Sequence, residues 1–135
     1  RANGCPWDFE TTGAAADRGH LEVAQWALEQ GCDWDPTLTT ADAAEGGNLA
    51  VLEWFLGHGG VVHELASAAA AGGGHLEVVQ WLHAHGCEWC ERTCMEAASS
   101  GHLEVLQWVR ANGCPWNEWT CSMAARGGHL EVLQW

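Results

Sequence analysis

The sequence predicts an all-α fold, a solenoid of about five helix-turn-helix units, from two recurring patterns. The motif Gly-His-Leu-Glu-Val begins at Gly19, Gly74, Gly101 and Gly128, with a diverged copy at Gly47. Successive copies are 28, 27, 27 and 27 residues apart, and self-similarity at a fixed period is the signature of stacked repeats. The Trp that closes each block recurs with the same spacing, at Trp26, Trp54, Trp81, Trp108 and Trp135.

The first element of each unit is predicted to be a short, alanine-rich helix. In the last complete unit, residues 113–118 are predicted to form a loop, and Thr120 is the predicted N-cap. In the preceding unit, Thr93 and Glu96 have the spacing of a capping box. In the last complete unit, Gly127 and Gly128 end the helix, because glycine adopts the left-handed conformation of a C-terminal cap. The small alanine side chains let the helix lie close to its neighbours.

The second element is a helix predicted over residues 102–111 in the fourth copy. Glu104 in its first turn and Arg110 in its last turn both favour the helix dipole. Apolar side chains cover most of its circumference: Leu103, Val105, Leu106, Trp108 and Val109. A helix packed against one partner needs one apolar face, so this pattern predicts burial against a neighbouring unit on each side. The Trp columns are interpreted as part of that core.

The unit resembles the repeat of the ankyrin-repeat family. The matching signature is Ala-Ala-x-x-Gly-His-Leu-Glu-Val-(Val/Leu)-x-Trp, as in residues 70–81 and 97–108. The usual ankyrin period is about 33 residues, whereas this one is about 27, and the missing residues fall where ankyrin repeats place a β-turn finger. The resemblance, which covers nearly the whole chain, therefore implies ankyrin-like units with shortened connecting fingers. It also implies a structural role for the His that opens each second helix.

Residues 1–135 are expected to form a single repeat domain that is a segment of a longer array. Residues 1–4 repeat the sequence of residues 110–113, the tail of a second helix, and Trp135 falls in the middle of one.

The composition excludes several classes of function. Eighteen acidic and five basic residues give a net charge of −13, which is unsuited to nucleic acid, whose phosphates require many Lys and Arg contacts. No apolar run approaches the roughly 18 residues that span a bilayer, so membrane insertion is not expected. No metalloprotease, P-loop or nucleophile-elbow motif occurs, and neither catalysis, a cofactor nor a small-molecule substrate is expected. The acidic charge favours a protein partner with a basic surface.

The seven cysteines are interpreted as small buried thiols in an intracellular, reducing compartment, most simply the cytoplasm. Equivalent positions in successive units should lie one helix-packing distance apart, about 8–10 Å. A disulfide requires Cα atoms within about 7 Å, so equivalent cysteines should not be bridged.

A zinc site is the alternative interpretation of one cysteine-rich segment. Cys90 departs from the repeat and completes a run of soft ligands with His83, Cys87 and Cys94, and zinc accepts four such ligands in a tetrahedron. Against this, Cys87 and Cys94 occupy core positions that face different ways.

Positions that vary between copies are candidates for partner recognition, because the solenoid itself fixes the others. The candidate binding residues are Asp8, Phe9, Glu10, Asp35, Leu38, His63, Glu64, Glu91, Arg92, Glu118, Trp119 and Met123. Phe9, Arg92 and Trp119 are of the types that anchor interfaces. The predicted function is a non-catalytic protein–protein interaction scaffold with an acidic, extended surface. The first alternative is an accessory subunit built permanently into a larger assembly, and the second is the zinc-binding module.

Overall fold

The computed structural model describes residues 9–31, 34–115 and 117–135, with side chains from residue 13 onward. Within these ranges the chain forms ten α-helices and no strand. The helices are α1 (Phe9–Asp17), α2 (Leu21–Glu29), α3 (Pro36–Glu45), α4 (Leu49–Gly57), α5 (Glu64–Gly73), α6 (Leu76–Ala84), α7 (Glu91–Ser99), α8 (Leu103–Ala111), α9 (Glu118–Arg126) and α10 (Leu130–Gln134). The predicted all-α repeat is confirmed, and no described helix is long and apolar enough to cross a membrane.

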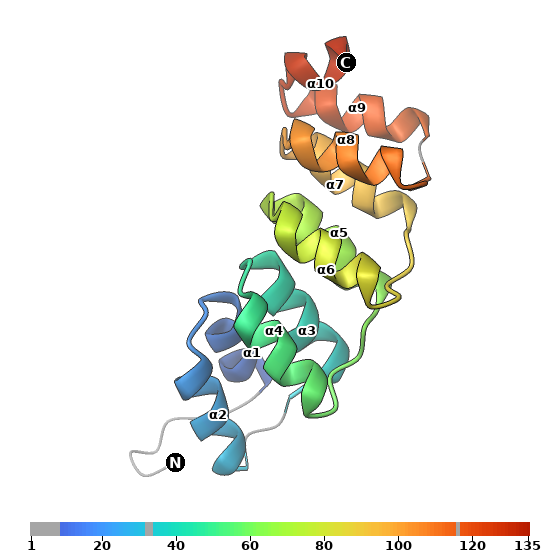
Figure 1. Cartoon of the computed structure of the whole chain (residues 1–135). Helices are drawn as coiled ribbons and strands as arrows, with labels where there is room; N and C mark the ends of the chain where they lie inside the picture. The colour runs from blue at the N-terminus through green and yellow to red at the C-terminus, as the bar shows by residue number, and fades with distance from the viewer. Residues whose placement is uncertain (1–8, 32–33, 116) are drawn as a thin grey trace.

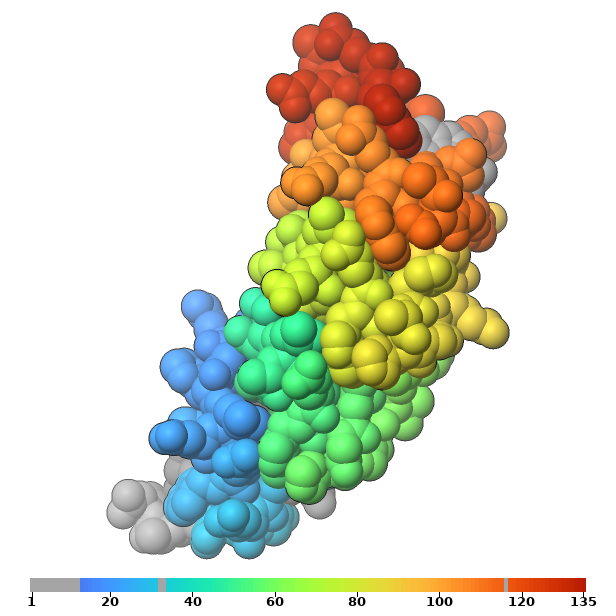
Figure 2. All heavy atoms as spheres, viewed as in Figure 1, coloured from blue at the N-terminus to red at the C-terminus, as the bar shows by residue number. Residues whose placement is uncertain are grey.

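The helices lie in two layers (Figure 1). The odd-numbered helices, which are the first helices of the units, stack directly on one another, and each even-numbered helix packs on the helix before it. Alanines at one repeat position explain the close stacking, because Ala43, Ala70, Ala97 and Ala124 are all fully buried. Figure 2 shows the resulting succession of units, which follow one another in chain order.

Larger apolar side chains fill the space behind this stack. Leu52, Phe55, Leu82, Leu106 and Val109 of the second helices are completely buried. One cluster of buried residues extends from Ala15 to Val132. The core is therefore continuous along the array, as expected when each unit covers the apolar surface of the next.

In two units, the residue before the second helix joins that unit to the preceding one by hydrogen bonds. Asn48 Nδ2 donates to the carbonyl oxygens of Ala16 and Asp17, at 3.0 and 2.7 Å. His129 Nε2 lies 2.8 Å from the carbonyl oxygen of Ser99. These contacts agree with the predicted structural role at His129 and at its equivalent Asn48.

The first helices begin three residues before the predicted caps. Asn117 is the N-cap of α9, and its Oδ1 accepts hydrogen bonds from the backbone nitrogens of Trp119 and Thr120, at 3.0 and 3.3 Å. Thr120 and its equivalent Thr93 are buried inside their helices. The prediction that these threonines cap the helices was wrong, because both pack in the core, and the N-cap residues are Asn117 in α9 and Cys90 in α7.

Candidate functional site

A groove of about 380 Å³ crosses the outer face of α3, α5 and α7. Ala68, Ala69 and Gly72 of α5, which carry a methyl group or no side chain, line its floor and leave room above the middle helix. The remaining lining residues are Ala41, Glu45, Leu65, Arg92, Glu96 and Ser100. The alanine-rich sequence that lets the first helices stack closely thus also hollows their exposed face.

Three charged residues line the groove, the acids Glu45 and Glu96 and the base Arg92. Arg92 is the one base among its lining residues, and its Nη2 lies 3.4 Å from Glu96 Oε1 one turn later. Burial of Asp42 on α3 raises the pKa of its carboxyl group, and repulsion from Glu45 and Asp17 raises it further. Negative charge is therefore crowded at the α1–α3 end of this face.

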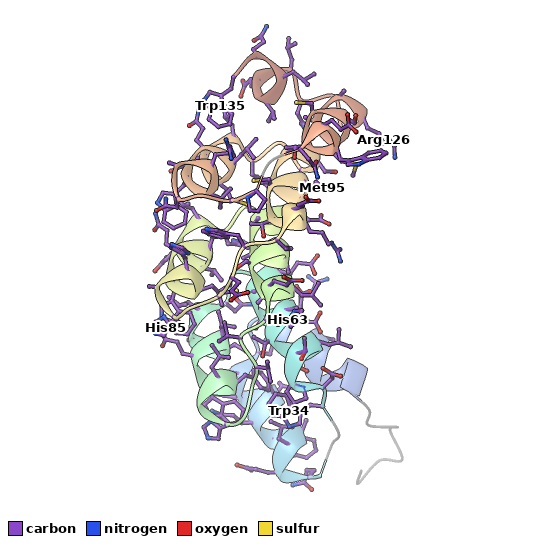
Figure 3. All side chains as sticks on the ribbon, turned by 90° about the vertical axis from the view of Figure 1, so that its right-hand side faces the viewer. Trp34, His63, His85, Met95, Arg126 and Trp135 are labelled. Atoms are coloured by element: carbon purple, nitrogen blue, oxygen red, sulfur yellow. The ribbon has the colours of Figure 1, made fainter. Side chains whose placement is uncertain are left out.

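Most of the predicted binding residues that the structure describes lie exposed on or beside the first helices. Leu38 and Trp119 are 47% and 58% exposed, which is high for large apolar side chains. Glu64, Glu91 and Glu118 begin α5, α7 and α9, Arg92 lines the groove, and Met123 is half-buried. Figure 3 shows this side of the molecule with Met95 and Arg126, opposite His85 and Trp135. Asp8 and the side chains of Phe9 and Glu10 lie outside the described residues.

Two of the predicted binding residues, Asp35 and His63, cap the helix that follows them. Asp35 Oδ1 accepts hydrogen bonds from the backbone nitrogens of Thr37 and Leu38, at 2.9 and 2.8 Å. His63 Nδ1 accepts one from the nitrogen of Leu65, at 3.1 Å. Their repeat position varies because several side chains can cap a helix, so its variation is not in itself a sign of partner recognition.

The residues considered as zinc ligands do not converge. His83 stacks on Trp89 with ring centroids 4.6 Å apart, and Cys87 Sγ lies 2.8 Å from Ser67 Oγ. Cys94 instead faces Cys114. Throughout the described part of the chain, no group of three or more His, Cys, Asp or Glu residues is arranged to hold a metal. The arrangement of these described residues therefore gives the zinc interpretation no support.

The second-helix side carries an aromatic arrangement that the sequence analysis did not identify. His58 and His85 stack on the Trp one turn earlier, with centroids 4.0 and 3.7 Å apart. In both, Nδ1 lies 2.7 Å from the carbonyl oxygen of that Trp. The spacing Trp-x-x-x-His in the sequence is the signal for it. The core interpretation of the Trp columns holds in part, because Trp54, Trp81 and Trp108 pack half-buried on the core, whereas Trp26 and Trp135 are exposed.

Stacked helix pairs around a continuous core define the molecule as an α-helical repeat solenoid. The family model for ankyrin repeats (many copies) matches residues 94–135. The helix pair within this matched region has the same form as the helix pairs of the preceding units. No curated protein matches the chain. Ankyrin repeats generally mediate protein–protein interactions and are generally non-enzymatic.

Proposed function

We propose that the chain is a non-catalytic scaffold that binds a basic partner protein along the face formed by α3, α5, α7 and α9. The observation that carries this proposal is the groove on α3, α5 and α7, which combines small apolar lining residues with the carboxylates of Glu45 and Glu96. A groove of this kind suits an extended segment or helix edge that carries Lys or Arg among apolar residues.

The residues around the groove support the same partner. Leu38 and Trp119 offer exposed apolar area on this face, and large side chains of this kind supply much of the binding energy of interfaces. The net charge of −13 would steer a basic protein toward the array and make the association rate sensitive to salt.

The competing proposal is a permanent subunit of a larger assembly, and one observation favours it. On α10, Leu130 and Leu133 are 62% and 45% exposed, an apolar surface that another subunit would bury. Such a contact would be largely independent of salt, because it would bury apolar area and few charges.

Native mass spectrometry of complexes assembled with an extract of the source organism tests both proposals. The variant Glu45→Lys/Glu96→Lys reverses two charges at the groove, and Glu104→Lys reverses an exposed charge on the second-helix layer as a control. We expect the groove variant to lose a partner that the control retains, and high salt to dissociate the wild-type complex. Retention of every partner by the groove variant would refute the proposed face, and a complex that survives high salt would favour the permanent subunit.

A further inference from the structure

Two buried cysteines from different parts of the repeat are in contact. Cys94 lies on α7, and Cys114 lies in the connection that follows α8. Both are completely buried, and their Sγ atoms are 2.9 Å apart. A disulfide bond measures about 2.05 Å, so the sulfurs need to approach by less than about 1 Å to bond. The expectation that equivalent cysteines remain unbridged does not apply to this pair, because the two residues occupy different repeat positions.

In the two preceding units, the positions equivalent to Cys94 and Cys114 also lie next to each other, but other residues occupy them. In the α5–α6 unit, Ser67 Oγ lies 2.8 Å from Cys87 Sγ. In the α3–α4 unit, a Cβ placed on Gly60 would lie 3.0 Å from Thr40 Oγ1. The fold thus places these two repeat positions side by side wherever the structure describes both of them. Among these three units, only the one containing α7 and α8 has a thiol at each position.

We propose that Cys94 and Cys114 form a reversible intramolecular disulfide when the protein meets a peroxide. The sulfur of Cys94 attacks one oxygen of hydrogen peroxide, the O–O bond breaks, and a sulfenic acid and one water result. The sulfur of Cys114 then attacks the sulfenic sulfur, the S–O bond breaks, and a second water leaves with the thiol proton. The two thiols lose two electrons in total, and the peroxide is reduced by two.

The surroundings of the pair suit this chemistry. The hydrogen bond between the two thiols lowers the pKa of Cys94 and raises that of Cys114. Burial and the neighbouring Cys90 raise the pKa of Cys94, whereas the positive charge of Arg110 lowers it. Hydrogen peroxide is small enough to enter during local opening of the connection.

The disulfide would tie α7 to the connection that leads into α9. That connection carries Asn117, whose Nδ2 already donates to Glu91 Oε2 at 2.9 Å, and it is followed by Trp119. The oxidised chain would therefore hold the start of α9 more firmly against α7. The bond itself does not depend on the proposed partner-binding function.

Thiol trapping combined with peptide mass spectrometry tests the proposal. Cys121 is exposed, so the protein carries Cys121→Ser to suppress links between molecules. The reduced, folded protein is treated with hydrogen peroxide, unfolded, and alkylated with N-ethylmaleimide. We expect two fewer alkylated cysteines and a linked peptide pair containing Cys94 and Cys114, which dithiothreitol separates.

Two further variants show whether the fold determines the pairing. Cys94→Ser reproduces the arrangement of Ser67 with Cys87, and we expect it to remain folded by circular dichroism and to form no link to Cys114. Ser67→Cys should create a second linked pair, with Cys87. Full alkylation of Cys94 and Cys114 in the treated, folded protein would overturn the proposal. Pairing of Cys94 with another cysteine, or linkage only after unfolding, would also overturn it.

Discussion

The two layers of helices differ in how the N-terminus of each helix is capped and in which side chains pack in the core. In the first-helix layer, side chains such as Asp35 and Asn117 cap their own helix. In the second-helix layer, the N-cap residues Asn48 and His129 make no such bond, and their side chains reach the carbonyls of the unit before. The first layer is packed with alanine, and the second with Leu, Val and Phe from α4 onward, whereas the buried residues of α2 are Ala24 and Ala27.

This difference separates two requirements of a solenoid. The first helices must approach closely, so their side chains are limited in size and the start of each helix is secured locally. The second helices stand farther apart, so bulky side chains must fill the space between units. Truncation should therefore damage the second layer most, and enlargement should damage the first layer.

The largest effect is expected for Phe55→Ala in α4. Phe55 is completely buried, with ring centroids 5.1 Å from both Trp34 and Trp54. Removing the ring should lower the free energy of unfolding by about 3–5 kcal/mol, measured by urea denaturation. Phe55→Leu is the matched control, because Leu82 occupies the same position in α6, and it should cost less than about 1.5 kcal/mol. Equal losses for the two variants would contradict the space-filling role.

The next largest loss of stability is expected when a buried alanine of the first layer is replaced by a larger residue. Ala97 on α7 is completely buried in the helix stack, and Ala97→Leu should cost about 1–3 kcal/mol in the same assay. Ala69→Leu adds the same atoms on the groove side of α5, where Glu96 is the equivalent residue of the next unit. It should change stability by less than about 0.5 kcal/mol. A larger loss at Ala69 than at Ala97 would reverse the assignment of the two faces.

The sequence was sufficient to predict the order of the helices, their glycine ends and the buried alanine columns. Each of these features depends on local conformation or on a pattern that repeats in every unit. The starts of the first helices were misplaced, because Thr93 and Thr120 also match a capping pattern and only tertiary packing decides that they are buried. Residues able to cap a helix stand at Asp35, His63 and Asn117, and they mark where the first helices begin.

The candidate site was less accessible to sequence reasoning. Leu38, Arg92 and Trp119 were predicted to lie on an exposed face, and the structure places them there. The groove itself depends on how three helices pack, which one repeat does not reveal. The contact between Cys94 and Cys114 depends on the path by which the connection folds back over α7, so comparing equivalent positions could not identify it.

Removing a helix cap from the first layer should lower the free energy of unfolding by an intermediate amount. Asn117→Ala removes two hydrogen bonds to backbone nitrogens of α9 and should cost about 1 kcal/mol, measured by urea denaturation. Cys90 is the N-cap of α7, but its side chain makes no capping bond. Cys90→Ala should therefore change stability by less than about 0.5 kcal/mol. If the two variants lost the same stability, the cap of α9 would not depend on the asparagine side chain.

The smallest effect concerns the crowding of acids in the first layer. Burial of Asp42, together with repulsion from Glu45 and Asp17, raises its pKa above the ordinary value of 3.8. Folding therefore favours the protonated carboxyl, and stability is lost as the pH rises through the folded-state pKa. Asp42→Asn should raise the midpoint of thermal unfolding slightly at neutral pH, and this gain should disappear near about pH 3, where the wild-type carboxyl is protonated in both states. Glu104→Gln, at an exposed acid of α8, should produce no gain of this kind. A benefit of Asp42→Asn that did not change with pH would mean that the amide improves packing and that charge crowding on this layer has little effect on its stability.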